Sequence, residues 1–452
     1  DMSQHLLAAD RLAEGNPSQL LNQGYPLGPH SIVVALNKGL GIGLVQGFSG
    51  LAVAVAILAC LTALATFAEL PLLPRTAGAL LVGLAYVVAS YFAQGAFKET
   101  MQALFFFGFV LALREAERSW RDLPLRFVPA ALIAVGSVYT YSFPGLIWLG
   151  GAAVLWLIAT RPPVRAVGLA LLAFFVLVAP EIGRMLDFHS FETFDPNGPG
   201  LGNLFGQISP FEALGIWPSG DFRLAPGDGA VPAVAYYLGI AFALVLFVYG
   251  VVQLWRGREK AILAGLGAAA LAYAAARLGG TPYTAAKAIE IAAPLVALAI
   301  LLPLLGEACR VSSPGGNKVD MRRLAVSVAA LFAAATGVCS LLALANAPVG
   351  PTSYSSTLSD YRKLVGEGPT LVVASPQLLR EEHGAPFLSW ELRGGRVCIQ
   401  STEEATGWPP AGVRFVIRED DDWTLTKVRR PAPGKTPCPP IAERQARQGP
   451  AR

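Results

Sequence analysis

The stretch ASYFAQGAFKET, residues 89–100, places Lys98 and Glu99 side by side between two long apolar runs. A carboxylate can take a proton from a hydroxyl group, and an ammonium group can stabilise a negative charge. The turn is very short, so the pair stays close to the helices on either side of it. The alternative is an ordinary charged helix end, because a glutamate in the first turn complements the helix dipole.

A second stretch, GGTPYTAAKAIEIAAP at residues 279–294, has a similar layout. GGTP ends one helix, and Thr284, Lys287 and Glu290 then recur at helical spacing near the start of an apolar run. A helix N-terminus together with Lys287 makes an anion-binding site. The alternative is an ion pair between Lys287 and Glu290, which lie three residues apart.

The composition indicates that the apolar runs cross a membrane. The chain has 452 residues, of which 54% are hydrophobic and 15% are charged. A soluble domain carries about a quarter charged residues. Apolar blocks of roughly 17–24 residues recur along the chain, which is enough to span about 30 Å of hydrocarbon. The sequence therefore predicts an α-helical, multi-pass integral membrane protein.

The apolar blocks predict about ten transmembrane helices, because backbone polar groups in lipid must pair internally. The third, fourth and fifth blocks are short and are joined by tight turns. The predicted spans cover residues 46–68, 76–93, 98–114, 126–141, 144–160, 164–182, 232–255, 260–277, 285–305 and 323–346. The sequence begins with Asp1 instead of Met, and no charged segment or signal peptide stands at its start, so we expect a first helix, a membrane anchor, to be missing before Asp1.

Basic residues orient the spans, because cytoplasmic turns carry an excess of Lys and Arg. One set of turns holds Arg75, Arg114, Arg118, Arg121, Arg126, Arg161, Arg165, Arg256, Arg258, Lys260, Arg310, Lys318, Arg322 and Arg323, and the alternate turns hold Lys98, Arg184, Arg223, Arg277 and Lys287. The first set is predicted to be cytoplasmic. Lys98, Glu99 and Lys287 then lie on the extracytoplasmic side.

Four parts follow from this topology. Residues 1–45 form an extracytoplasmic first loop with interfacial helices, and residues 46–346 form the transmembrane domain with a long outer loop at 184–231. Residues 347–430 form a small extracytoplasmic α/β domain with strands at TLVVAS, RVCIQ and VRFVIRE. Residues 431–452 are a Pro-rich, partly disordered tail.

The cysteines fit the same topology. Cys60, Cys309 and Cys339 lie in or beside predicted spans and have the pattern of ordinary small buried residues. Cys398 and Cys438 both lie in the outer tail, where disulfides persist. We expect these two to form a disulfide bond.

The arrangement resembles the GT-C superfamily of membrane glycosyltransferases, in an uncharacterised bacterial branch that uses polyprenyl-phosphate sugars. The resemblance lies in a first outer loop with an acidic residue, a short second outer loop with another, many spans and a C-terminal outer domain. The segments YPLGPH at 25–30, QGAFKE at 94–99 and GTPYTAAKA at 280–288 are similar to segments of such proteins. The family often has two adjacent carboxylates in its first loop, whereas this sequence shows Asp1 without a visible acidic neighbour.

The resemblance implies transfer of a sugar from a lipid-linked donor to a glycan, lipid or protein acceptor outside the bacterial inner membrane, with the bilayer as a partner and no nucleic acid. It implies catalytic roles for Asp1, as the base, and Glu99. It implies substrate-binding roles for His5, Tyr25, His30, Lys98, Tyr283, Lys287 and Glu290. A divalent cation, Mg²⁺ or Mn²⁺, is an alternative to lysine as the charge that stabilises the phosphate.

Two other function classes stay open at this stage. A transporter or flippase for a lipid-linked substrate would also place charges at the mouth of a helix bundle, although no internal repeat is visible. A non-catalytic assembly protein of the cell envelope is the third class. The sequence does not identify the sugar, the acceptor or the oligomeric state.

Overall fold

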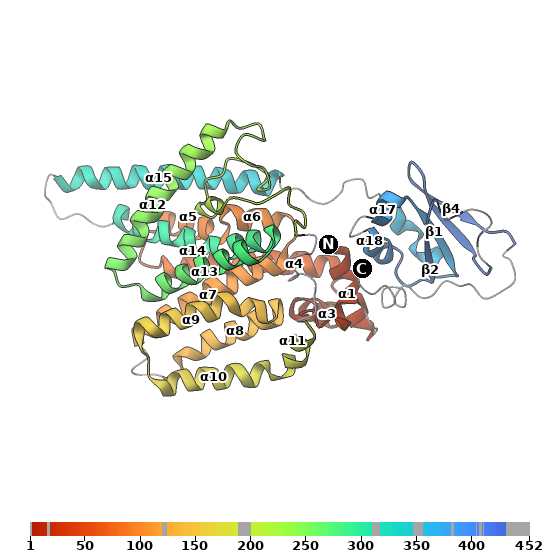
Figure 1. Cartoon of the computed structure of the whole chain (residues 1–452), viewed down its shortest axis with the longest axis horizontal. Coiled ribbons are helices and arrows are strands. Elements are labelled where there is room, and N and C mark those ends of the chain that lie inside the picture. The colour runs from red at the N-terminus through yellow and green to blue at the C-terminus, as the bar shows by residue number, and fades with distance from the viewer. Residues whose placement is uncertain are drawn as a thin grey trace. The chain divides into compact units, whose positions relative to one another are not determined.

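The protein is mainly helical, with one small sheet (Figure 1). A computed structural model describes residues 2–15, 19–119, 124–188, 200–309, 317–346, 356–380, 384–403, 405, 409 and 411–430. The chain divides into two compact units. The membrane unit contains Pro26–Pro29 and Phe48–Val349, and the terminal unit contains Asp1–Tyr25, His30–Gly47 and Gly350–Arg452.

The membrane unit is built almost entirely of helices. Its α-helices are α4 (Leu44–Thr66), α5 (Leu72–Gly83), α6 (Tyr86–Ala93), α7 (Phe97–Ser119), α8 (Val128–Tyr141), α9 (Leu146–Thr160), α10 (Val164–Val178), α11 (Ile182–Phe188), α12 (Ala233–Arg256), α13 (Lys260–Gly279), α14 (Pro282–Cys309) and α15 (Asn317–Asn346). Short 3-10 helices are η1 (Pro124–Phe127), η2 (Phe143–Gly145), η3 (Ala179–Glu181) and η5 (Pro210–Leu214).

Each of the ten predicted spans coincides with a helix or a helix pair. Within the described residues, seven helices are long and apolar enough to cross a membrane, and the pair α5–α6, bent by 59°, gives an eighth. The other two predicted spans are α7 and α8. Helix α7 carries charged residues in its first and last turns, and the apolar helix Leu125–Tyr141 is short. The protein is therefore a multi-pass membrane protein, with two helices of the bundle that do not qualify as full crossings.

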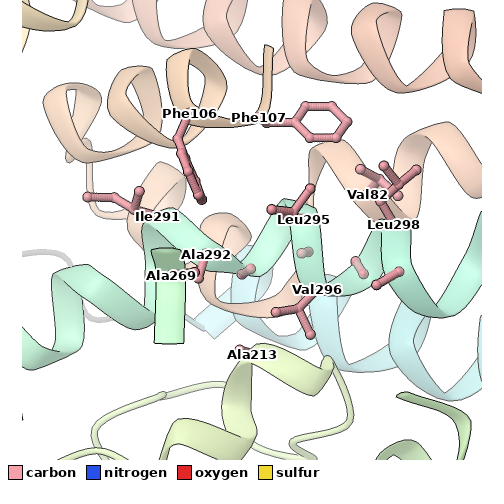
Figure 2. Close-up of a cluster of buried hydrophobic side chains, with 14 of the residues drawn as sticks. Val82, Phe106, Phe107, Ala213, Ala269, Ile291, Ala292, Leu295, Val296 and Leu298 are labelled. Atoms are coloured by element: carbon pink, nitrogen blue, oxygen red, sulfur yellow. The ribbon is translucent and has the colours of Figure 1, made fainter. Parts of the chain in front are cut away.

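Helix α14 lies at the centre of the membrane unit and packs against α5, α6, α7, α12, α13 and α15. Its residues 291–306 carry no polar or charged side chain on any face, as expected of a helix enclosed by others. Figure 2 shows its neighbourhood: Ile291, Ala292, Leu295, Val296 and Leu298 of α14 lie among Val82 of α5, Phe106 and Phe107 of α7, Ala213 of η5 and Ala269 of α13.

Two prolines inside α14 change how its neighbours pack. Pro303 has no N–H to donate to the carbonyl of Ala299, four residues earlier. Helix α12 approaches this carbonyl at Gly250, where a Cβ atom would collide with the oxygen of Ala299. Small residues at such contacts allow helices in a membrane to pack closely. Pro294 has the same relation to the carbonyl of Glu290, which concerns the site described below.

The terminal unit combines the N-terminal helices with a small α/β domain. Its elements are α1 (Met2–Glu14), α2 (Gln19–Asn22), α3 (Gly28–Leu40, which begins in the membrane unit), η6 (Ser356–Tyr361), α16 (Arg362–Val365), β1 (Thr370–Ala374), α17 (Pro376–Arg380), α18 (Gly384–Glu391), β2 (Val397–Ser401), β3 (Phe415–Glu419) and β4 (Trp423–Lys427). The strand order is β2-β1-β3-β4. Strand β1 is parallel to β2 and β3, and β4 is antiparallel to β3.

The predicted strands of the tail are present as β1, β2 and β3, but the sequence analysis missed β4. In this strand only Trp423 is buried, and the charged turn before it gives no strand signal. The predicted first helix is present as α1, which packs against α18. Oδ1 of Asp10 in α1 lies 3.9 Å from Nε of Arg393, which follows α18. Burial raises the pKa of Asp10, while Arg393 opposes this shift.

Candidate active site

The turn between α6 and α7 fixes the positions of Lys98 and Glu99. Gly95 has a φ of +75°, a left-handed conformation that glycine adopts without strain. The amide of Ala96 donates to the carbonyl of Tyr91 at 3.0 Å, which closes the turn. Helix α7 begins one residue later, so Lys98 and Glu99 stand in its first turn, as predicted.

The start of α14 is fixed by a reciprocal pair of hydrogen bonds. The Oγ1 of Thr281 accepts from the amide of Thr284 at 3.2 Å, and the Oγ1 of Thr284 accepts from the amide of Thr281 at 2.8 Å. These bonds satisfy amides that a helix N-terminus leaves open. The amide of Tyr283 donates to the carbonyl of Gly200 at 3.0 Å, which ties the outer loop to this point.

An ion pair joins the two helix starts. The Nζ of Lys287 lies 2.9 Å from Oε1 of Glu99, and the two side chains are 12% and 9% exposed. This finding replaces the local alternative from the sequence, in which Lys287 pairs with Glu290. Two residues predicted separately, one from each stretch, are thus in direct contact.

Aromatic rings surround the two lysines. The Nζ of Lys287 lies 4.1 Å from the ring centre of Tyr283 and 5.9 Å from that of Tyr141. The Nζ of Lys98 lies 5.4 Å from the same ring of Tyr141. Cation–π contacts of this kind hold a positive charge where little water is present. Tyr141 therefore connects both lysines from the end of α8.

Glu290 and Tyr91 complete the group. Glu290 is fully buried one helical turn after Lys287, and it interacts electrostatically with Glu99 and Lys287. Tyr91, buried at the end of α6, interacts electrostatically with Tyr283, Glu290, Glu99 and Lys287. We call the set of Tyr91, Lys98, Glu99, Tyr141, Tyr283, Lys287 and Glu290 the charged cluster.

The charged cluster combines two lysines and two glutamates in a buried setting. Electrostatic interactions are stronger there than in water, because the surroundings screen them less. Lys98 and Lys287 are suited to stabilising an anion such as a phosphate. Ionisable residues inside a membrane protein commonly mark a substrate or ion site. Among the described residues there is no group of three or more His, Cys, Asp or Glu that could hold a metal ion, so the divalent cation stays a prediction.

Three other predicted residues meet in the terminal unit. Nδ1 of His5 lies 3.1 Å from Nε2 of His30, and both side chains are buried. The ring of Tyr25 lies 5.8 Å from that of His5 and 6.1 Å from that of His30, between ring centres. Asp1, the predicted base, lies outside the described residues. Its catalytic role stays a prediction.

Sequence reasoning missed Tyr91 and Tyr141. Both lie in apolar runs, where a tyrosine is usually an ordinary packing residue. The sequence signal in each case was the position near a helix end. Tyr91 lies just before the AQGAFKE turn, and Tyr141 comes directly before SFPG. Their relation to the lysines required the three-dimensional arrangement.

No protein-family model matches the chain, and the comparison with curated proteins also finds no match. Solved structures do match it. ArnT from Cupriavidus metallidurans, bound to undecaprenyl phosphate, aligns with a TM-score of 0.50 and 13% identity over 92% of this chain and 88% of that one. Its apo state aligns with a TM-score of 0.47 and 14% identity over 88% and 82%.

The mycobacterial arabinofuranosyltransferase AftD aligns with a TM-score of 0.51 and 17% identity. The alignment covers 87% of this chain but 30% of AftD, so the chain spans less than a third of that protein. ArnT and AftD are both GT-C membrane glycosyltransferases. The chain has the GT-C fold. At such low identities the likeness establishes the fold, and it confirms the predicted resemblance and fold class.

Proposed function

We propose that this GT-C protein is a membrane-embedded glycosyltransferase that moves a sugar from a polyprenyl-phosphate donor to an acceptor. The observation that carries the proposal is the buried Lys287–Glu99 ion pair beside Lys98, in a protein with this fold. The structure of ArnT with undecaprenyl phosphate supports a donor of this lipid class. The basic residues of the turns support a reaction on the extracytoplasmic side of a bacterial inner membrane.

The proposed reaction needs a base and a stabilised leaving group. The acceptor hydroxyl oxygen attacks the anomeric carbon of the sugar, and its proton passes to a carboxylate, for which Asp1 is the predicted residue. The bond between the anomeric carbon and the phosphate oxygen breaks, and its electron pair goes to the polyprenyl phosphate. Lys98 and Lys287 stabilise the negative charge that develops there.

Glu99 has a supporting role in this proposal. Its carboxylate holds the ammonium group of Lys287 at 2.9 Å, so the lysine is already oriented when the donor arrives. A preorganised charge contributes more to catalysis than one that must move into place. The neighbouring ring of Tyr283, 4.1 Å from the same ammonium, restricts its position further.

The test is sugar transfer by purified protein of native length in proteoliposomes supplied with labelled undecaprenyl-phosphate sugars. Lys287→Met should lower the transfer rate by about 100-fold or more, since it removes a charge aimed at the leaving group. Lys260→Met is the matched control, because that lysine lies elsewhere in the membrane unit and donates to the carbonyl of Ala159. Movement of the intact glycolipid across the bilayer without transfer would support the transporter alternative and contradict this proposal.

A further inference from the structure

Buried polar atoms without hydrogen-bond partners gather in and around the charged cluster. In the described part of the chain, both carboxylate oxygens of Glu290 and the hydroxyl of Tyr91 have no partner. The same holds for Nε2 of Gln94, in the turn before Lys98, and for Nε1 of Trp148, whose ring meets that of Tyr141 edge to face. Native proteins satisfy about nine in ten buried polar groups. The open groups of the cluster are therefore available to a polar ligand.

The chemistry of these open groups defines the ligand. Glu290 offers two acceptors, Gln94 and Trp148 offer donors, and Tyr91 can act as either. A ring that carries several hydroxyl groups can donate to and accept from all of them. A set that contains both donors and acceptors matches such a ring better than it matches a simple ion.

A cation is a poorer match for Glu290. Lys287, one turn away, already interacts electrostatically with Glu290 and forms the ion pair with Glu99. The described residues also hold no set of three or more His, Cys, Asp and Glu that could bind a metal ion. A buried carboxylate that accepts hydrogen bonds from hydroxyl groups loses much less on burial than an unpaired one.

The backbone of α14 adds an acceptor at the same place. Pro294 lies four residues after Glu290, so it cannot donate the usual helical hydrogen bond to the carbonyl of Glu290. This point lies about 12 Å along the helix from its start, at 1.5 Å per residue. Glu290 therefore has both a side chain without a hydrogen-bond partner and a backbone carbonyl without its usual helical donor.

We propose that Glu290 and Tyr91 form a sugar subsite in the membrane unit, which binds the hydroxyl groups of the donor's uncharged sugar ring. The inference rests on the proposed function, and it separates two tasks within the charged cluster. Lys98 and Lys287 hold the phosphate, whereas Glu290 and Tyr91 recognise the sugar. Both residues are therefore specificity determinants, because they distinguish a glycosylated lipid from the bare lipid phosphate.

The experiment compares binding of two kinds of lipid by native mass spectrometry of the protein in nanodiscs. The probes are undecaprenyl phosphate and its glucose, mannose and arabinofuranose derivatives. The measured quantity is the sugar increment, which is the ratio of the Kd for the bare lipid to the Kd for the best derivative. Glu290→Gln and Tyr91→Phe should each lower the increment, by about 10- to 100-fold for the charged residue, while the Kd of the bare lipid stays unchanged.

Two matched controls come from the same unit. Glu212 in η5 is also a buried glutamate with an open oxygen, and Tyr86 is a buried tyrosine of α6 whose hydroxyl donates to the carbonyl of Ser219 at 2.9 Å. Glu212→Gln and Tyr86→Phe should leave the sugar increment unchanged. They also show whether replacing a buried glutamate by glutamine, or a buried tyrosine by phenylalanine, disturbs the fold.

The outcomes separate the two proposals. If the wild-type protein binds none of the four lipids, the proposed function fails. If it binds undecaprenyl phosphate but no derivative more tightly, or if the increment survives in both Glu290→Gln and Tyr91→Phe, the sugar subsite is excluded and the phosphate site stands. Equal weakening of bare and glycosylated lipids by both variants also contradicts the subsite, because it indicates a structural role.

Discussion

Nζ of Lys287 on α14 lies 2.9 Å from Oε1 of Glu99 on α7, in a buried ion pair between two helix starts. Taking one partner out of such a pair leaves a buried charge uncompensated, at a cost of about 3–5 kcal/mol. Replacing both partners by neutral residues removes this penalty. The pair can therefore be tested for stability and for activity separately.

We expect Glu99→Gln to lower the free energy of unfolding and the rate of sugar transfer, the latter by about 100-fold because Lys287 loses the partner that orients it. The double variant Glu99→Gln/Lys287→Met should recover most of the stability but none of the activity. Thermal unfolding in detergent and the transfer assay measure the two effects. The control is Glu259→Gln, which weakens the partly buried pair of Glu259 with Arg114 and should affect stability alone. Recovery of activity in the double variant would show that the pair is purely structural.

The predicted orientation can be tested by cysteine labelling in intact cells. With Cys60 and Cys309 changed to alanine, Ala230→Cys in the exposed outer loop should react with a membrane-impermeant maleimide. Arg256→Cys, exposed at the end of α12, should react only after the cells are permeabilised. The reverse pattern would place the charged cluster on the cytoplasmic side and overturn the proposed site of reaction.

Cys398 is disulfide-bonded, whereas Cys60, Cys309 and Cys339 are free thiols. The predicted partner, Cys438, lies outside the described residues. We expect peptide mapping without reductant to find Cys398 linked to Cys438. Reduction should destabilise the terminal unit by about 2–4 kcal/mol. Alkylation of both residues before reduction would exclude the bond, and Cys60→Ser serves as a control that leaves it intact.

Burial raises the pKa of Glu212 well above its usual value, although a hydrogen bond from the amide of Ser209 opposes the shift. The folded protein thus prefers the neutral acid, so its stability falls as pH rises from the unfolded pKa towards the folded one. Glu212→Gln keeps an oxygen for Ser209 and has no charge to gain. Thermal unfolding should show that the variant gains stability relative to wild type as pH rises above the usual pKa of a glutamate. A pH-independent difference would show that Glu212 is ionised in the folded protein.

The sequence alone was sufficient to determine where the helices lie and which charged residues deserve testing. Apolar runs in lipid can only become helices, so the ten predicted spans coincide with helices or helix pairs. Lys98, Glu99, Lys287 and Glu290 stood out because ionisable residues are rare at membrane depth. His5, Tyr25 and His30 were also selected, and they meet in the terminal unit.

The tertiary structure decided which of these residues are partners. Sequence spacing permits Lys287 to reach Glu290 on its own helix, but the packing of α7 against α14 brings Glu99 to it instead. The packing of α6 and α8 adds Tyr91 and Tyr141, whose positions near helix ends did not by themselves connect them to the lysines. The physical reason is that helical periodicity defines neighbours within one helix. The side chains that a residue meets on another helix depend on how the whole bundle packs.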